Sequence, residues 1–249
     1  MKILSWNILA DEFIEPTYYP MVKVSLLKNR QERLINIINK IIKYNADIIM
    51  LQEVMKEEYT IIKKVFSKKY FISNLYPILW SSEKVHSESG NITLIKKKLS
   101  SKVNFDIFSK EIPFVIGRFI YNKSEIVIVN IHLDDSSKKN RLIQIKEIVS
   151  HISNDSNVII GGDFNEPYSN QNKIYLYLKK HLFEPSIIKN STYFIEESML
   201  IDNIMYKNFN FIKSQVRNKC GGRTINNINC QFKTYGSDHF PTIVYLDVE

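Results

Sequence analysis

Several short apolar segments of this sequence each end at an acidic or amide residue. The segment ILSWN ends at Asn7, IIMLQE ends at Glu53, and NVIIGGD ends at Asp163. A carboxylate at the end of an apolar strand is costly to desolvate unless it meets a cation or hydrogen-bond donors. We therefore expect these strand ends to converge on one site.

The same pattern recurs later in the chain. His132 follows the apolar run IVIVNI, Asp202 lies within LIDNIM, and Asp238 and His239 stand just before the segment TIVYL. Each of these residues alone has a simple structural explanation, such as a turn aspartate, a helix cap or a satisfied core histidine. Their joint occurrence favours a shared functional site.

The periodicity of the apolar residues predicts a mixed α/β fold. Apolar positions spaced three and four apart indicate amphipathic helices over 28–44, 56–66 and 138–152. Short β-branched or aromatic runs indicate strands over 2–7, 48–51, 71–73, 91–96, 112–121, 125–131, 158–160, 200–206 and 242–246, with a hairpin turn at 121–124. Strands mixed with a few helices favour sheets with helices on their outer faces and exclude purely helical and purely β folds.

Length and composition narrow the class further. The chain has 249 residues, 44% of them hydrophobic, which is enough for a sizeable core and excludes wholesale disorder. No repeat or linker divides it, so we predict a single domain over 1–249. No apolar run reaches the roughly 18 residues that a spanning helix needs. We predict a monomer with no membrane partner, in the cytoplasm or alternatively in the nucleus.

The net charge of +8 permits a polyanionic partner without requiring one. Most of the basic residues are Lys, which A/T-rich codons encode, so codon bias is an equally good explanation. Arg is scarce, and its guanidinium group binds phosphate bidentately. The candidate substrate clamps are therefore the arginines, although a salt bridge to a neighbouring acid explains each of them as well: Arg30, Arg33, Arg118, Arg141, Arg217 and Arg223.

Hard oxygen ligands with amides and imidazoles suit Mg²⁺ or Mn²⁺ better than zinc. The two cysteines, Cys220 and Cys230, are too few for a four-ligand zinc site, and we expect free thiols. Hydrolysis of a phosphodiester needs a cation, an activated water and donors to the phosphoryl oxygens. Glu53 could hold the metal and Asp163 could orient or deprotonate the water. The candidate donors to phosphate oxygens are Asn7, Asn165, His132 and His239, with Asp202 as the partner of His239.

Six ordered motifs carry a family resemblance: WN, LQE, NIHLD, GGDFN, LIDNIMY and SDHFP. In this order they resemble the endonuclease/exonuclease/phosphatase superfamily. The resemblance implies a four-layered α/β sandwich, in which two mixed β-sheets pack face to face with helices on the outer faces. It also implies a Mg²⁺ site at the strand ends.

The resemblance assigns expected roles by motif. Asn7 and Glu53 match the metal residues, and Asp238 matches a metal-side carboxylate. The remaining catalytic matches are Asp163 for water activation, Asn165 and His132 for phosphate binding, and Asp202 as the aspartate that pairs with His239. The segments NILADEF, LKNRQERL and YNADIIMLQEV are similar to the deadenylase, nocturnin and 2′-phosphodiesterase branch. HLDD and the stretch from Arg141 look more like tyrosyl-DNA phosphodiesterase, and SDHFP is similar to bacterial-type nucleases and abasic endonucleases.

These observations predict a Mg²⁺-dependent phosphodiesterase that acts on nucleic acid, as an exonuclease, a deadenylase-like enzyme or an end-processing enzyme. We expect single-stranded RNA or DNA rather than duplex as substrate, with Trp6 as a candidate for stacking on a base. The alternatives are an abasic-site endonuclease, or a phosphatase or phospholipase on inositol phosphates or sphingomyelin. A third alternative is a non-enzymatic module that binds RNA through its basic face.

Overall fold

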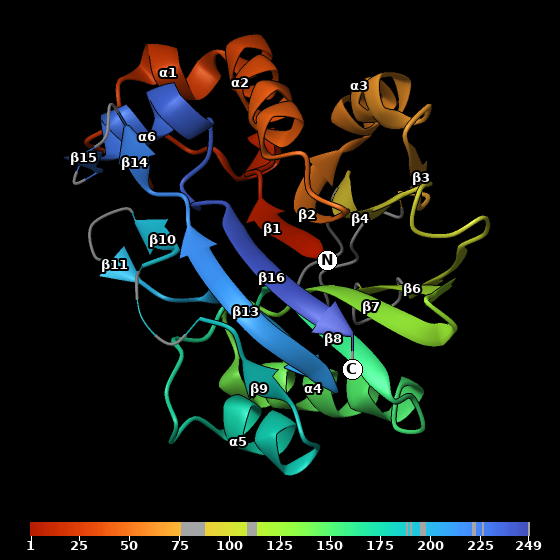
Figure 1. Ribbon diagram of the computed structural model, residues 1–249. Helices are drawn as coiled ribbons and strands as arrows, with labels where there is room; N and C mark the ends of the chain where they lie inside the picture. Colours follow the sequence, from red (N-terminus) through yellow and green to blue (C-terminus); the bar gives the residue numbers. More distant parts are fainter. Residues whose placement is uncertain are drawn as a thin grey trace.

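Two mixed β-sheets form the centre of the protein in the computed structural model (Figure 1), which describes residues 1–75, 88–108, 114–187, 189, 191–194, 198–220, 223–225 and 227–248. The first sheet has the order β13-β16-β1-β2-β4-β3, with the strands β13 (Phe209–Val216), β16 (Thr242–Val248), β1 (Lys2–Asn7), β2 (Ile48–Met55), β4 (Ser89–Lys96) and β3 (Tyr70–Ile72). The second sheet has the order β5-β6-β7-β8-β12-β9, with the strands β5 (Asn104–Phe108), β6 (Phe114–Tyr121), β7 (Ser124–His132), β8 (Asn157–Asp163), β12 (Asp202–Lys207) and β9 (Glu184–Pro185).

Each sheet contains one parallel pair at its centre. Strand β1 runs parallel to β2, and β7 runs parallel to β8, whereas the other pairings within these sheets are antiparallel. Parallel neighbours need a crossover connection, which α2 (Arg30–Tyr44) and α4 (Lys138–His151) provide. The carboxyl ends of the four parallel strands carry Asn7, Glu53, His132 and Asp163.

Alternate side chains of the strands pack in two different hydrophobic cores. The inner core lies between the two sheets, and the outer core lies beneath the helices. Ile3 and Ile48 of the first sheet pack against Ile128 and Ile159 of the second, which fills the space between the sheets. Successive side chains of a strand point to opposite faces, so the neighbouring Leu4 belongs instead to the cluster beneath the helices.

Helices cover the outer face of each sheet (Figure 1). On the first sheet the apolar faces of α2, α3 (Lys56–Phe66) and α6 (Ile228–Tyr235) pack on strand residues such as Leu51. On the second, α4 and α5 (Lys173–Lys180) pack on residues such as Val129. The result is a four-layered α/β sandwich, which confirms the predicted fold. The remaining short elements are α1 (Val24–Lys28), a 3-10 turn (Asp11–Phe13), and the hairpins β10 (Tyr193–Phe194) with β11 (Ser198–Met199) and β14 (Lys219–Cys220) with β15 (Arg223–Thr224).

The predicted elements agree with the structure in type and differ at several boundaries. The helix over 56–66 and the hairpin at 121–124 are confirmed, and the part of the predicted strand 112–121 at 112–113 lies outside the described residues. The strand predicted over 48–51 continues to Met55 through a β-bulge. Among the longer elements, α5, α6, β5 and β13 were not predicted from the sequence. In the described part of the chain, no helix has both the length and the apolar character to cross a membrane.

Candidate active site

Asn7 links the two sheets at the carboxyl ends of their parallel strands. Its amide Nδ2 donates to Glu53 Oε1 at 2.7 Å in its own sheet and to Asp163 Oδ2 at 3.1 Å in the other sheet. Its Oδ1 accepts the backbone N–H of Leu9 at 3.0 Å. The expected convergence of the strand ends is therefore present, with one buried amide between two buried carboxylates.

The backbone of β2 aims Glu53 into this site. The register of β2 against β4 shifts between Leu51 and Val54, and Glu53 has a φ of 57°. A bulge of this kind bends a strand and redirects a side chain, and here the Oε2 atom accepts the backbone N–H of Ala10 at 2.9 Å. Burial raises the pKa of Glu53, and the nearby charge of Asp238 raises it further.

A pair of buried, hydrogen-bonded amide side chains joins the two sheets next to these strand ends. Gln52 of β2 donates from Nε2 to Asn130 Oδ1 of β7 at 2.7 Å. Asn130 in turn donates to the carbonyl oxygens of Leu51 and Ile92 at 3.1 and 2.8 Å. Because buried amides with partners hold one geometry, this pair fixes β2 and β7 against each other directly beneath the site.

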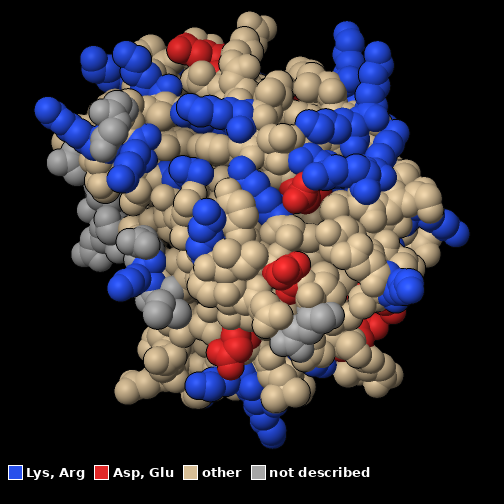
Figure 2. All heavy atoms as spheres, in the orientation of Figure 1, with Lys and Arg blue, Asp and Glu red and all other residues tan. Residues whose placement is uncertain are grey.

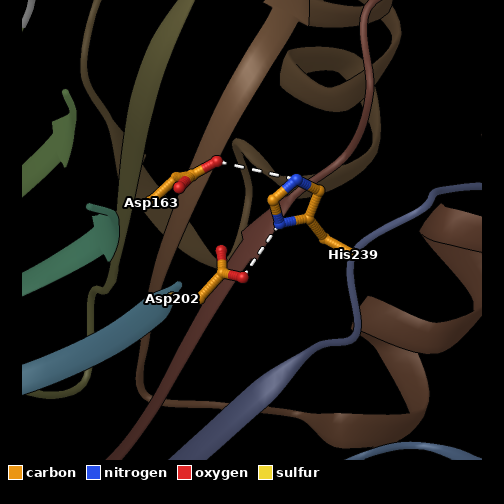
Figure 3. A group of neighbouring side chains, drawn as sticks. All are labelled: Asp163, Asp202 and His239. Atoms are coloured by element: carbon orange, nitrogen blue, oxygen red, sulfur yellow. Dashed lines mark hydrogen bonds and ion pairs between the residues drawn. The ribbon is translucent and has the colours of Figure 1, made fainter. Parts of the chain in front are cut away.

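His239 lies between two carboxylates of neighbouring strands (Figure 3). Asp163 at the end of β8 and Asp202 at the start of β12 are directly opposite each other in the sheet, an arrangement that repels without a cation. His239 Nδ1 lies 2.8 Å from Asp202 Oδ2, and its Nε2 lies 3.6 Å from Asp163 Oδ2. The imidazole thus separates the two like charges.

The charges around His239 favour its protonated form. Burial lowers the pKa of the ring, but Asp202, Asp163 and Asp238 together outweigh burial and raise the pKa of His239 well above its ordinary value. Burial raises the pKa of Asp202, and the charge of His239 opposes this rise. The pair therefore holds an imidazolium next to Asp163.

The loop after β8 places Asn165 beside Asp163. The Asp163 Oδ1 atom accepts the backbone N–H of Asn165 at 2.8 Å, and Asn165 adopts a φ of 50°. Its Nδ2 donates to the carbonyl of Leu133 at 2.9 Å. On the other side, His132 Nε2 lies 3.8 Å from both Glu53 Oε1 and Asp163 Oδ2. Both predicted phosphate-side residues therefore border Asp163.

Two aromatic residues that were not predicted from the sequence also border the site. The Tyr19 hydroxyl donates to Asp238 Oδ2 at 3.0 Å, and the Tyr193 ring lies 4.8 Å from the His239 ring, centroid to centroid. Tyr19 lies in a turn-rich segment, and the bridge between Tyr193 and His239 joins residues far apart in the sequence. Neither residue belongs to a strand-end motif, so the sequence offered no signal for them.

The composition of the cluster fits a divalent cation. Four buried carboxylates meet here with two imidazoles, so the acidic groups outnumber the basic groups that could offset their charge. The ligand atoms of Asp163, Asp202 and His239 lie within 4.8 Å of one another. However, Asp202 already occupies His239 Nδ1, and an imidazolium does not ligate metals. The carboxylate oxygens of Glu53 and Asp238 are the better donors for a hard cation.

Four arginines predicted as substrate clamps have other partners in the structure. Arg33 is buried and binds Asp11 Oδ1 at 2.7 Å and the carbonyl of Gly236 at 2.8 Å. Arg30 also pairs with Asp11, at 2.9 Å, and with Glu57 at 2.5 Å. Both arginines therefore join α2 to neighbouring segments and are paired with carboxylates, as the salt-bridge explanation expects.

The other two arginines lie in the second sheet's half of the molecule. Arg141 is buried and binds Glu166 Oε2 at 2.7 Å, just beyond the loop that carries Asn165. Arg118 pairs with Asp106 at 3.1 Å and Asp155 at 3.0 Å. These contacts also agree with the salt-bridge explanation that the sequence left open.

Trp6 is also placed differently from the prediction. Its ring is fully buried, and its Nε1 donates to the carbonyl of His239 at 3.1 Å. A buried indole cannot stack on a base, so Trp6 instead supports the backbone of the loop that presents His239.

Three comparisons place the chain among known proteins. A model of the endonuclease/exonuclease/phosphatase family matches residues 4–239. The crystal structure of ANGEL2, described as a 2′,3′-cyclic phosphatase, superposes with a TM-score of 0.77 at 14% identity, over 98% of this chain and 94% of that one. The human nocturnin catalytic domain with bound sulfate gives 0.69 at 15% identity, over 100% and 93%. TDP2 of D. rerio with a single-stranded DNA product gives 0.68 at 14% identity, over 100% and 99%. No curated protein matches by sequence.

Proposed function

The chain belongs to the endonuclease/exonuclease/phosphatase family, and from this we propose that it is a Mg²⁺- or Mn²⁺-dependent phosphodiesterase that hydrolyses single-stranded nucleic acid. The observation that carries the proposal is the buried Asp202–His239 pair, whose free ring nitrogen faces Asp163 beside the Asn7–Glu53 contact. This arrangement combines a proton donor, a carboxylate and a cation site within one cluster.

Three residues would hold the metal ion. Glu53 would be the principal ligand, with Asp238 beside it, because both offer carboxylate oxygens. Asn7 faces Glu53 and Asp163 with its Nδ2 atom, so its amide group would have to turn over to offer an oxygen to the ion. When bound, Mg²⁺ supplies positive charge that offsets the developing charge on the phosphoryl oxygens.

The protein's own groups would handle the water and the phosphate. Asp163 would accept a proton from the attacking water or orient it, since its Oδ2 atom lies 3.6 Å from His239 Nε2 in the same cluster. The His239 imidazolium, oriented by Asp202, donates to a phosphoryl oxygen. Asn165 and His132 border Asp163 and would position the remaining oxygens.

The choice of nucleic acid is supported by the proteins with similar folds. TDP2 has been captured with a single-stranded DNA product, and ANGEL2 in complex with adenosine-2′,3′-vanadate. Because ANGEL2 is a 2′,3′-cyclic phosphatase, hydrolysis of 2′,3′-cyclic phosphate ends is a second candidate function for this chain. The alternative activities on abasic sites, inositol phosphates and sphingomyelin are included as substrates in the test below. We still predict that the protein is monomeric and cytoplasmic.

A substrate panel tests this proposal. It comprises single-stranded oligo(A), mixed RNA, a 2′,3′-cyclic phosphate end, a 5′-tyrosyl oligonucleotide, abasic duplex DNA, an inositol phosphate and sphingomyelin, each with Mg²⁺, Mn²⁺ or EDTA. We expect metal-dependent cleavage of a single-stranded substrate that Glu53→Gln and Asp163→Asn abolish. Glu147→Gln, an exposed carboxylate on α4, is the matched control and should retain full activity. Cleavage that persists in EDTA or in both site variants would refute the proposal.

A further inference from the structure

A second concave surface lies outside the active site, between the C-terminal end of α2, the end of β13 and helix α6. It is a groove of about 690 Å³, and its basic residues are Lys2, Lys40, Lys43, Arg217 and Lys219. We call it the basic groove. Figure 2 shows Lys and Arg side chains gathered over this region. Lys2 begins the strand that ends at Asn7, so that part of the groove is roughly 17 Å from the metal residues, at about 3.3 Å per residue.

The charges of the basic groove are not neutralised by carboxylates. Among the described residues that line it there is no Asp or Glu. In the part of the chain that the structure describes, none of its five cations forms an ion pair with a carboxylate, unlike Arg33 or Arg141. Burial and the charge of Lys43 lower the pKa of Lys40, which shows how closely these cations crowd. Such a surface attracts a polyanion.

Two tyrosines hold cations of the groove in place. The Arg217 guanidinium lies 5.6 Å from the ring centroid of Tyr44, and Lys40 Nζ lies 4.8 Å from that of Tyr235. The Nε atom of Arg217 is buried and makes no hydrogen bond among the described residues. Cation–π contacts restrain these side chains while leaving their donors available, so little ordering is needed when a ligand binds.

The wall of the basic groove is continuous with the loop that carries His239. Tyr235 packs edge-to-face on Trp6, with 6.3 Å between ring centroids, and Trp6 donates to the His239 carbonyl. The backbone N–H of Arg217 donates to the carbonyl of Pro241 at 2.8 Å. The groove and the active site are therefore built on two sides of one segment.

We propose that the basic groove is a second nucleic-acid-binding site, which holds the sugar-phosphate backbone of a single strand away from the bond that is cleaved. Five cations spread over such a volume exceed what one phosphate requires, whereas a strand presents a phosphate at every nucleotide. The concave shape suits a strand better than a flat anionic membrane. The proposal rests on the proposed function, because it takes the substrate to be a polynucleotide.

Binding without catalysis tests the groove directly. The full chain is titrated in EDTA against 5′-fluorescein-labelled oligo(A) of 20 and of 4 nucleotides, and anisotropy is measured over a range of salt concentrations. The variant is Lys40→Gln with Arg217→Gln. The matched control is Lys63→Gln with Lys146→Gln, two lysines that also lie over tyrosine rings but on α3 and α4. Lys43→Gln with Lys219→Gln, which removes exposed charges only, guards against misfolding.

We expect both groove variants to bind the 20-mer on the order of tenfold more weakly at 50 mM salt, and the slope of log K against log salt to fall by about 1.4, or 0.7 for each lost contact. Binding of the 4-mer and Mg²⁺-dependent cleavage of the 4-mer should match the control. Groove variants that bind the 20-mer as the control does would overturn the proposal. The proposal would also be overturned if the groove variants lost binding only to phosphatidylglycerol vesicles and not to the 20-mer. If the proposed function is wrong, metal-dependent cleavage will be absent. The binding titration in EDTA does not depend on cleavage, so the two failures can be distinguished.

Discussion

The His239 ring is held by Asp202 through a buried contact of 2.8 Å between Nδ1 and Oδ2. The other ring nitrogen lies 3.6 Å from Asp163, the carboxylate on the neighbouring strand. Because Asp202 fixes both the orientation and the charge of the ring, it can affect catalysis without touching the substrate. Under the proposed function it would be a positioning residue for His239.

The first prediction concerns this contact. Asp202→Asn keeps the shape of the side chain but removes the charge that stabilises the imidazolium, so we expect kcat to fall by about 10²–10⁴ with little change in KM. The pH–rate profile should also move, because the pKa of His239 falls when its largest favourable charge is lost. Steady-state kinetics between pH 5 and 9 measure both. Asp155→Asn, which removes a partner of Arg118, is the control, and a kcat equal to it would contradict the assignment.

The second prediction concerns the metal. Mg²⁺ should raise the melting temperature, because it relieves the surplus negative charge of the cluster, and it stabilises the fold by about 2.7 kcal/mol at a hundredfold excess over its Kd. In Glu53→Gln this increase should be lost. The measurement is a thermal melt with and without Mg²⁺, in which Glu147→Gln should respond like the wild type. An equal response in Glu53→Gln would mean that Glu53 does not hold the metal.

The strand-end residues could be predicted from the sequence because a local pattern marks them. An apolar run that stops at a polar residue, as in the segments before Asn7 and Asp163, indicates both a buried strand and the position where that strand ends. This pattern predicted that the strand ends converge, whereas the parallel pairing of β1 with β2 and of β7 with β8 became known only from the structure.

The roles of the arginines could not be predicted, because their partners are not local. Asp11 is 22 residues from Arg33 in the sequence, and Glu166 is 25 residues from Arg141. Strand β13 was missed for a different reason. Its residues from Asn210 to Lys213 are exposed at the edge of the sheet, so its apolar pattern is weak.

The third prediction separates the two glycines of GGDFN. A Cβ at Gly162, where φ is +148°, would lie 1.9 Å from the carbonyl oxygen of Ile131, whereas one at Gly161 would meet the flexible end of Met50 at 2.3 Å. Backbone cannot yield as a methionine side chain can. Gly162→Ala should therefore lower the free energy of unfolding by more than about 4 kcal/mol or prevent folding, and Gly161→Ala by about 1–3 kcal/mol. Urea denaturation measures both, and equal losses would argue against this backbone geometry.

The fourth prediction is a pH dependence of stability at α3. Burial raises the pKa of Glu58 to about 7, against the opposing contributions of the Met55 N–H and of Arg33 and Arg30. The folded state therefore binds a proton that the unfolded state has released, and this contribution to stability is lost as the pH rises from about 4.5 to above 7.

The variant Glu58→Gln cannot release that proton and can still accept the Met55 N–H. Between pH 5 and pH 8 it should lose less stability than the wild type, by roughly 1–3 kcal/mol. Urea denaturation at the two pH values measures this difference. Glu57→Gln, at the exposed neighbouring position, should keep the wild-type dependence. Parallel behaviour of Glu58→Gln and the wild type would show that Glu58 is ionised throughout.

The fifth prediction distinguishes a structural arginine from a substrate clamp. Arg33 is 3% exposed and binds Asp11 and the carbonyls of Gly236, Ile8 and Leu9. Arg33→Met leaves these oxygens without donors and should cost about 3–5 kcal/mol in the free energy of unfolding.

Arg118→Met is the matched comparison, because Arg118 also pairs with two carboxylates but is partly exposed, and it should cost less than about 1 kcal/mol. Since both guanidinium groups are already paired with carboxylates, we expect KM to stay at the wild-type value in Arg118→Met and in the folded fraction of Arg33→Met. Urea denaturation and steady-state kinetics on the same preparations test both statements. A large rise in KM with unchanged stability would restore the substrate role to Arg33, and would then require its contact with Asp11 to open during binding.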